Sequence, residues 1–426
     1  MTSKNNTCFV YITLPGETKP VTAGKLVIND TDIGAVGRFI YGKSYLSRPQ
    51  AVAIDPIELK LTDKIYDTVK MGGVFGAIRD ASPDHWGRRV IQKELNRIDV
   101  SEMEYLLKSP DDRIGALGFG LNNEPPAPLY EFNKTLDLER LQIIADKIIS
   151  GDYAEDNITE KHERVQAEEL LLIGTSMGGA RPKAVVYDDN SLWLAKFNTN
   201  RDNWNNTLVE HAMLNLAAAC GLNVAQSKTL RIGSRDVLLV KRFDREYAKD
   251  GFFRNRMFSA LTALRSDDSP TLRENWSYPA LVEELRRFSH APREDAKELF
   301  MRMVFNSLIT NTDDHPRNHA FIAREGNKWR LAPAYDLTPS PVLSQRRDLA
   351  MAVGKHGRGA NIENLTSECE RFLLEPPQAE SIIKTMAEIV GSNWYRVMRS
   401  AGVNETDCEK LNAAFVYDGF WACRDW

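Results

Sequence analysis

One stretch, residues 311–336 (NTDDHPRNHAFIAREGNKWRLAPAYD), carries residue types and spacings suited to phosphoryl transfer. Asp313 and Asn318 lie five positions apart, and Asp336 follows what reads as a β-hairpin. In kinases an Asp orients the attacking hydroxyl, an Asn downstream holds Mg²⁺, and an Asp after a strand holds Mg²⁺ against the phosphates. The Asp-to-Asn spacing equals that of the kinase catalytic loop. A polar turn would explain a few of these residues, but not the order of helix, loop, hairpin and Asp.

A pair of glycines lies upstream, in the segment IGTSMGGARPK at residues 173–183. Gly178 and Gly179 allow positive φ and close backbone approach, so that exposed N–H groups can cradle phosphates. The segment does not match a Walker A loop, and it leads into a strand. Taken alone, a Gly-Gly turn before a strand explains it equally well.

Lys196 lies near the end of a predicted strand at residues 192–197, as the nucleotide-binding lysine does in the V-A-I-K strand of kinases. A solvated lysine at a strand end is the simpler explanation when the residue is considered in isolation. Glu210, in the helix that follows, has two explanations of equal weight. It can pair with Lys196, or it can close a capping box by bonding back to the N–H of Thr207, and the two can hold together.

His315 either contacts the nucleotide or packs within its loop, and the sequence does not decide between these roles. Histidines spaced as metal ligands are absent, since His315 and His319 are the only close pair. An H-x-x-x-H pair needs a helix to bring both rings to one face, and Pro316 argues against a helix there.

The elements that must position these residues form a mixed α/β front half and a mainly helical back half. Strands are predicted at residues 9–12, 24–28, 37–41, 183–187, 192–197, 319–323 and 329–333, with a further hairpin over 227–242. One helix is predicted to begin after Ser82 as N-cap, with Pro83 at its first position. Other helices are predicted at 137–149, 157–172, 208–220, 257–264, 278–288, 293–310, 377–390, 394–399 and 405–415.

Composition describes an ordinary globular protein of two or three domains, with 426 residues, 42% hydrophobic and 27% charged. The net charge of −4 argues against a broad nucleic-acid footprint on this chain alone. The five cysteines include no C-x-x-C motif, so neither a disulfide framework nor a zinc site is expected. No signal-peptide pattern and no apolar run of about 18 residues is present. We therefore expect a cytoplasmic protein without a membrane association.

Taken together, several motifs resemble the HipA-type serine/threonine kinases, which are toxins of bacterial toxin–antitoxin modules. The motifs are FGAIRDASPDHWGRR (75–89), DRIGALGF (112–119), GTSMGGARPK (174–183), LAKF (194–197), LVKRFDR (239–245), NTDDHPRNHAFI (311–322) and APAYDL (332–337). The resemblance covers nearly the whole chain. It implies an α+β, bilobal protein-kinase-like fold, with a β-rich N-terminal subdomain (1–152), a kinase N-lobe (153–242) and an all-helical C-lobe (243–426).

The resemblance also implies a role for each matching position. Asp313 would be the catalytic base, Asn318 and Asp336 would hold Mg²⁺, and Lys196 would bind the phosphates of ATP. The phosphate loop would comprise Gly178, Gly179, Ala180, Arg181, Pro182 and Lys183, and the adenine hinge Val240, Lys241 and Arg242. Further ATP contacts would come from His315, Pro316, Arg317 and Tyr335. Ser176 matches the serine that family members autophosphorylate, which inactivates them, with Thr175 as the second choice.

Family members usually bind a small helix-turn-helix antitoxin of the HipB type, and the pair binds operator DNA. Some members phosphorylate an aminoacyl-tRNA synthetase, the glutamyl enzyme, whereas others have different protein substrates. The resemblance therefore implies a protein substrate without naming it. Two alternatives stay open: a kinase of a small molecule, and a catalytically weak corepressor that acts with the antitoxin.

Overall fold

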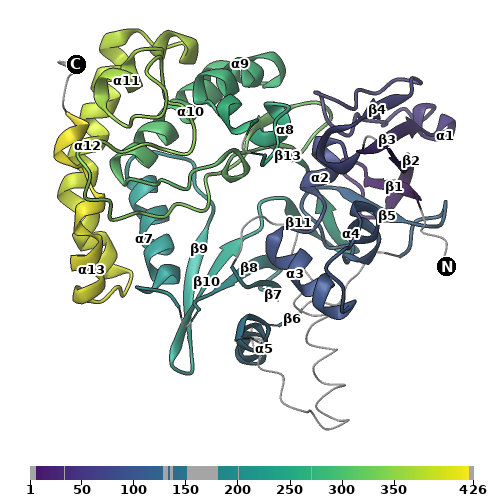
Figure 1. Ribbon diagram of the computed structural model, residues 1–426, viewed down its shortest axis with the longest axis horizontal. Coiled ribbons are helices and arrows are strands. Elements are labelled where there is room, and N and C mark those ends of the chain that lie inside the picture. Colours follow the sequence, from purple (N-terminus) through teal and green to yellow (C-terminus); the bar gives the residue numbers. More distant parts are fainter. Residues whose placement is uncertain are drawn as a thin grey trace.

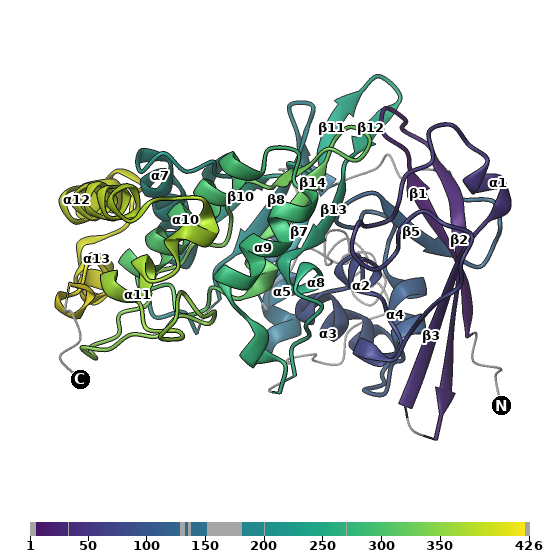
Figure 2. The same cartoon turned by 90° about the horizontal axis from the view of Figure 1, so that it is seen from above.

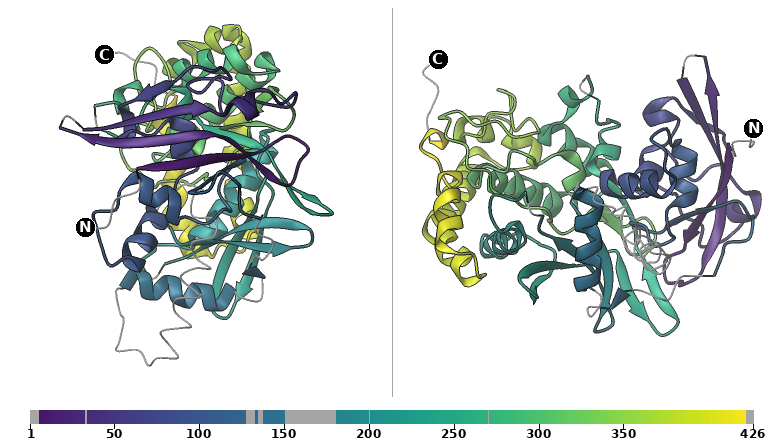
Figure 3. Two further views of the ribbon diagram at one scale, coloured as in Figure 1. Left: turned by 90° about the vertical axis from the view of Figure 1, so that its right-hand side faces the viewer. Right: turned by 60° about the horizontal axis from the view of Figure 1, so that its bottom comes forward.

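The computed structural model describes residues 6–32, 34–127, 133–134, 138–150, 181–199, 201–269 and 271–421. It has the mixed α+β composition expected from the sequence, with a β-rich N-terminal region, a central sheet and a mainly helical C-terminal half (Figure 1). The N-terminal sheet and the C-terminal helices lie at opposite ends of the molecule (Figure 3). The central sheet lies between them.

The N-terminal sheet is antiparallel, with the strand order β4-β3-β2-β1-β5. Its strands are β1 (Thr7–Thr13), β2 (Pro20–Thr31), β3 (Gly34–Tyr41), β4 (Tyr66–Thr68) and β5 (Leu117–Gly120). The first three contain the strands predicted at 9–12, 24–28 and 37–41. Cys8, Val10 and Ile12 share one face of β1, because successive side chains of a strand point to opposite faces, and all three are fully buried; towards the end of the strand Tyr11 and Thr13, on the other face, are buried too.

Short helices connect this sheet to the rest of the chain. They are α1 (Lys43–Leu46), α2 (Gly76–Asp80), α3 (His85–Glu94) and α4 (Glu102–Lys108). Helices α2, α3 and α4 lie between the sheet and the remainder of the molecule (Figure 2). The prediction of Ser82 as N-cap is wrong, because Asp84 caps α3 by accepting the N–H of Gly87 at 2.8 Å.

The central sheet has the strand order β6-β7-β8-β10-β9. Its strands are β6 (Asn133–Lys134), β7 (Lys183–Asp188), β8 (Ser191–Phe197), β9 (Ser227–Ile232) and β10 (Arg235–Lys241). Both predicted hairpins are confirmed. Asp189 and Asn190 have φ of +46° and +54° at the β7–β8 turn, and this positive φ is what a two-residue hairpin turn requires. Lys183 and Lys196 are paired in register across this hairpin.

Helix α5 (Leu138–Ser150) matches the helix predicted at 137–149, and α7 (Asn206–Ala219) matches the one at 208–220. The helix predicted at 157–172 lies outside the described residues. In the C-terminal half the longer helices are α9 (Tyr278–Phe288), α10 (Pro292–Leu308) and α12 (Pro376–Ser400), with the shorter α8 (Ala260–Ala263), α11 (Ile362–Thr366) and α13 (Glu405–Leu411). Helix α12 packs against α7 and so joins the two halves.

The C-terminal half also contains strands. A hairpin is formed by β11 (Arg245–Ala248) and β12 (Gly251–Arg254), and a sheet by β13 (Arg256–Ser259), β14 (Ala320–Ala323) and β15 (Trp329–Leu331). The strands predicted at 319–323 and 329–333 correspond to β14 and β15, whereas the sequence interpretation missed β11, β12 and β13. The helix predicted at 257–264 is therefore wrong in its first half. Strand β13 is fully buried and pairs with β14, more than 60 residues along the chain, so tertiary pairing overrides local pattern.

Two predicted helices at 377–390 and 394–399 form the single helix α12. The Gly-Ser-Asn sequence between them does not break the helix, because the buried stripe continues from Ile383, Met386 and Val390 to Met398. Among the helices that the structure describes, none combines the length and apolar character needed to cross a bilayer.

Candidate active site

The predicted catalytic loop follows the C-terminal end of α10. The loop turns at Thr310, which has a φ of +52°, and Asp313 lies exposed at its tip. The backbone carbonyl of Asp313 accepts the N–H of His315 at 2.8 Å and Nδ2 of Asn318 at 3.2 Å. Within the described parts of the chain, the Asp313 carboxylate accepts no hydrogen bond of its own. It is thus held near Asn318 while remaining available to a bound group.

The next residue, Asp314, holds the loop against the core. Its carboxylate is buried and accepts the hydroxyl of Tyr278, and it lies 3.0 Å from Nε2 of His319. Asn306 on α10 donates to the Tyr278 hydroxyl at 3.1 Å. The neighbouring carboxylates of Asp313 and Asp314 therefore differ in environment, one facing the cavity and the other facing the core. The five-residue spacing to Asn318 selected Asp313 and gave Asp314 no role.

Lys196 on β8 brings together residues from three parts of the chain. Its Nζ lies 2.6 Å from Oε1 of Glu210 on α7 and 2.9 Å from Oδ1 of Asp336. Asp336 has a φ of +60°, a left-handed conformation that Asp tolerates better than most residues. One cation is thus shared by two carboxylates, and the group carries a net negative charge.

The alternative explanation of Glu210 as part of a capping box is wrong. The N–H of Thr207 donates to Oδ1 of Asn198 at 3.1 Å. The N-cap of α7 is Asn205, whose side chain accepts the N–H of Leu208. Because Asn205 caps the helix two residues earlier than expected, the Glu210 side chain is left to bond Lys196.

The pKa values of Lys196, Asp336 and Glu210 are all shifted from their ordinary values. Burial alone would lower the pKa of Lys196, but Asp336 and Glu210 beside it raise this pKa above its ordinary value. Burial would raise the pKa of Asp336, yet Lys196 lowers it to about 2. Burial raises the pKa of Glu210, and this effect exceeds the attraction of Lys196. The more exposed carboxylate of Asp336 is therefore the firmly ionised one and is suited to binding a cation.

Asp313 lies close enough to this group to sense it. Burial raises the pKa of its carboxyl, and the charges of Asp336 and Asp314 raise it further, while His315 opposes them. A carboxylate of raised pKa accepts a proton more readily than an ordinary aspartate does. The arrangement can therefore activate a hydroxyl group.

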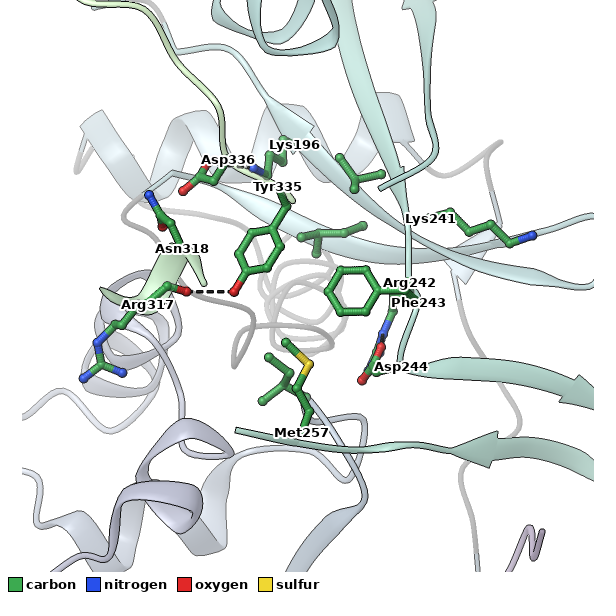
Figure 4. A pocket seen from close by; sticks show the side chains of 13 residues that line it. Lys196, Lys241, Arg242, Phe243, Asp244, Met257, Arg317, Asn318, Tyr335 and Asp336 are labelled. Carbon is green, nitrogen blue, oxygen red and sulfur yellow. Dashed lines mark hydrogen bonds and ion pairs between the residues drawn. The ribbon is translucent and has the colours of Figure 1, made fainter. Parts of the chain in front are cut away.

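An apolar slot opens beside Lys196 (Figure 4). It is lined by Ile114, Leu194, Lys196, Val240, Lys241, Arg242, Phe243, Asp244, Met257, Arg317, Asn318, Tyr335 and Asp336. The rings of Phe243 and Tyr335 lie 5.8 Å apart, and the Tyr335 hydroxyl donates to the carbonyl of Arg317 at 2.8 Å. The side chain of Lys241 extends away from the slot (Figure 4). A flat apolar ring is the ligand that such walls favour.

The side chain of Arg242, at the predicted hinge, turns away from the slot into a buried ion network. Its guanidinium pairs with Asp112 at 2.5 Å and with Asp244 at 2.9 Å, and Arg245 pairs with Asp244 at 2.7 Å. Burial would raise the pKa of Asp244, but the two arginines lower it to about 2. Arg242 therefore contributes backbone to the slot, while its side chain fixes the N-terminal region, through Asp112, against the hinge.

The predicted phosphate loop is described only at its end. Arg181 is exposed and pairs with Asp202 at 2.8 Å, and Pro182 is buried. Lys183 is buried and bonds Asp84, the N-cap of α3, at 2.6 Å. Lys183 is thus tied to the N-terminal region. The remaining predicted positions, namely Thr175, Ser176, Gly178, Gly179 and Ala180, lie outside the described residues.

A larger cavity of about 620 Å³ adjoins the slot and contains Asp313. It shares Lys196, Arg317, Asn318 and Asp336 with the slot, and its far wall is formed by α2, α3 and the residues between them. His315 lines this cavity, whereas Pro316 is buried in the short 3₁₀ helix Pro316–Asn318.

Tertiary structure thus collects most predicted positions around two connected spaces. The slot takes Lys196, Val240, Lys241, Arg242, Arg317, Asn318, Tyr335 and Asp336, and the cavity adds Asp313, His315, Arg181 and Lys183. The sequence interpretation missed the apolar wall formed by Ile114, Leu194, Phe243 and Met257. Two of these residues could have been found from the sequence. Phe243 lies in the motif LVKRFDR, beside the predicted hinge, and Ile114 lies in the motif DRIGALGF.

Comparison with known proteins identifies both halves of the chain. Residues 18–120 match the HipA N-terminal domain, and residues 175–394 match the HipA-like C-terminal domain. One relative is Y4mE of Sinorhizobium fredii, which is provisionally named a kinase. It is 31% identical over 158 residues, which cover 34% of this chain and 36% of that protein. A protein of Haemophilus influenzae, also provisionally named a kinase, is 24% identical over 154 residues, or 33% of this chain and 44% of that one. The chain thus spans less than half the length of these curated relatives.

The fold is similar to that of a chain in the structure of the Shewanella oneidensis toxin–antitoxin system, in which HipA, HipB and operator DNA form a complex. The TM-score is 0.68 at 16% identity, and the match covers 95% of this chain and 94% of that chain. At this identity the likeness shows the fold. Since the C-terminal family model alone spans more than half of the chain, and the N-terminal model matches most of the first sheet, this protein belongs to the HipA family.

Proposed function

We propose that this protein is an ATP- and Mg²⁺-dependent serine/threonine protein kinase, the toxin of a toxin–antitoxin module. The observation that carries the proposal is the convergence on Lys196. Its ammonium is held by Glu210 and by Asp336, and the same two connected spaces contain Asp313 and Asn318. These are the parts that a kinase needs to position phosphates, metal and hydroxyl.

The residues present fit a magnesium ion. Asn318 donates through Nδ2 to the carbonyl of Asp313, which leaves its side-chain oxygen as the ligand atom, and the Asp336 carboxylate is ionised. Both offer the oxygen donors that Mg²⁺ requires. When bound, the ion would neutralise phosphate charge. Lys196 would then hold the phosphates, the apolar slot would take the adenine ring, and Asp313 would accept the proton of the attacking hydroxyl.

The narrow slot encloses only about 50 Å³. Ligand sites usually measure about 300–1,000 Å³. We therefore expect the Phe243 and Tyr335 rings to move apart when the adenine ring enters, which a change in the intrinsic fluorescence of the protein on ATP addition would report.

We further propose, from the family, that the kinase phosphorylates itself on Ser176 or Thr175 and is thereby inactivated. A phosphate adds nearly two negative charges beside a phosphate site. We also propose a helix-turn-helix antitoxin partner that carries the contact with operator DNA, and a protein substrate such as an aminoacyl-tRNA synthetase.

The decisive experiment is intact-mass measurement and phosphopeptide mapping after incubation with ATP and Mg²⁺, with Asp313→Asn beside the wild type. Phosphate on Ser176 or Thr175 in the wild type alone would support the proposal. ATP binding without phosphate on any residue or added protein would contradict it and favour the corepressor. Transfer to metabolites alone would favour a small-molecule kinase, which the cavity beside Asp313 is large enough to serve.

A further inference from the structure

The cavity beside Asp313 has one wall that the kinase mechanism does not use. This wall belongs to the N-terminal region and consists of α2, the connection after it and the start of α3. It lines the same cavity as Asp313, and an acceptor hydroxyl must enter this cavity to reach Asp313. A role for this wall in recognising the acceptor rests on the proposed kinase function.

Most of the other cations that line the cavity are paired with carboxylates; the exception is Arg273, whose Nε donates to the carbonyl of Asp268. Arg88 forms a two-point ion pair with Glu102 at 2.5 and 2.7 Å. Arg317 pairs with Asp268 at 2.7 Å. Lys183 and Arg181 are paired with Asp84 and Asp202. In each pair the carboxylate neutralises the cation, so little net positive charge is left to attract an anion.

Arg79 on α2 differs from these cations. Within the described parts of the chain its guanidinium forms no hydrogen bond or ion pair, although it lines the cavity. Burial, together with the nearby charges of Arg88 and Arg317, lowers its pKa to about 10, and Glu102 and Asp268 oppose this shift. A desolvated guanidinium without a counterion is unfavourable, so an anion that entered the cavity would gain a strong contact here.

The anion is not expected to be the nucleotide. Lys196 and Asp336, which would hold the phosphates and the metal, line the apolar slot as well as the cavity, whereas Arg79 lines only the cavity, together with α2 and α3. The charges that act on Arg79 belong to Arg88 and Glu102 of the N-terminal region and to Arg317 and Asp268 of the C-terminal half. Arg79 is therefore placed to contact the acceptor and not the phosphates.

We propose that this cavity binds the acceptor segment of the substrate and that Arg79 selects for an anionic side chain near the acceptor hydroxyl. A guanidinium forms paired hydrogen bonds to a carboxylate or to a phosphate group. The anionic residue is thus Asp, Glu or an already phosphorylated residue of the substrate chain. Arg79 is a specificity residue, and Asp313 remains the base.

The test begins with a serine-centred peptide library phosphorylated by the full-length wild type. We expect enrichment of Asp and Glu at one position near the serine. A matched set of three peptides with Glu, Gln or phosphoserine at that position then separates carboxylate from phosphate recognition. Loss of one charge-assisted pair predicts a KM about 10- to 100-fold higher for Gln than for the preferred anion, with a smaller change in kcat.

Arg79→Gln should remove this difference between the peptides, and Arg79→Lys, which keeps the charge, should restore part of it. The matched control is Arg38→Gln, because Arg38 is an exposed arginine of the same region that pairs with Asp67 on the outer part of the sheet. It should keep the wild-type preference. Circular dichroism checks that each variant is folded, and the comparison of peptides on the wild type needs no variant.

Phosphorylation by the wild type without an acidic preference, or a preference that persists in Arg79→Gln, would overturn the inference and leave the kinase proposal intact. Failure of the wild type to phosphorylate any peptide or protein would overturn the kinase proposal and this inference with it.

Discussion

Glu210→Gln tests whether the ion pair at Lys196 serves phosphotransfer. The substitution keeps the shape of the side chain and removes its charge. Glu210 is bonded to Lys196 at 2.6 Å, so the loss of a hydrogen bond between charged groups would cost about 1.5–3 kcal/mol. Lys196 would keep Asp336 as its remaining partner, at 2.9 Å. We expect the lysine to move towards that carboxylate and away from the phosphates.

If the lost interaction acts in the transition state, each 1.36 kcal/mol corresponds to about a tenfold change in rate, and kcat would fall about 10- to 150-fold. The assay is transfer of labelled phosphate from ATP at saturating Mg²⁺, with ATP affinity measured by calorimetry. Asn205→Ala is the matched control, because it removes the actual cap of α7 and would cost about 1 kcal/mol of stability. It should leave kcat unchanged. A Glu210→Gln protein with wild-type kcat and reduced stability would refute the reasoning and make Glu210 a purely structural residue.

Three further predictions concern the aspartates of the site. Asp313→Asn should lower phosphotransfer by about 10²- to 10⁴-fold, the usual contribution of a general base, with an unchanged unfolding midpoint in urea; the wild-type rate should rise with pH through the raised pKa of Asp313. Asp314→Ala should instead destabilise the fold by about 1–3 kcal/mol, because Tyr278 and His319 lose a buried partner; equal stability to the wild type would contradict this. The lowered pKa of Asp336, about 2, stabilises the fold above pH 3.8, and this stabilisation is lost as the pH falls to about 2. Because the side chain is a third exposed, Asp336→Asn should lower the free energy of unfolding by only about 1 kcal/mol, as measured by denaturation at pH 6 and pH 3.

Local sequence was sufficient where a feature depends on a few neighbouring residues. Asp313 and Asn318, which their spacing singled out, lie in one loop and are joined there by a hydrogen bond. The β7–β8 hairpin was predictable because its turn needs residues that tolerate positive φ. Asp84 shows the limit of such reasoning, since Ser82 and Asp84 are both good N-caps and the contact with Lys183, 99 residues away in sequence, favours Asp84.

The sequence alone was enough to identify the chemical groups and their local spacing: a candidate base, two candidate metal ligands, a lysine on a strand and the motifs of the HipA family. Which of these groups meet depends on the tertiary structure. It pairs Lys196 with both Glu210 and Asp336, turns Asp314 into the core beside an exposed Asp313, and brings Arg79 from the N-terminal region to the wall of the same cavity. Burial and charge pairing depend on residues far apart along the chain, and such contacts leave no periodic or spacing signal in the sequence.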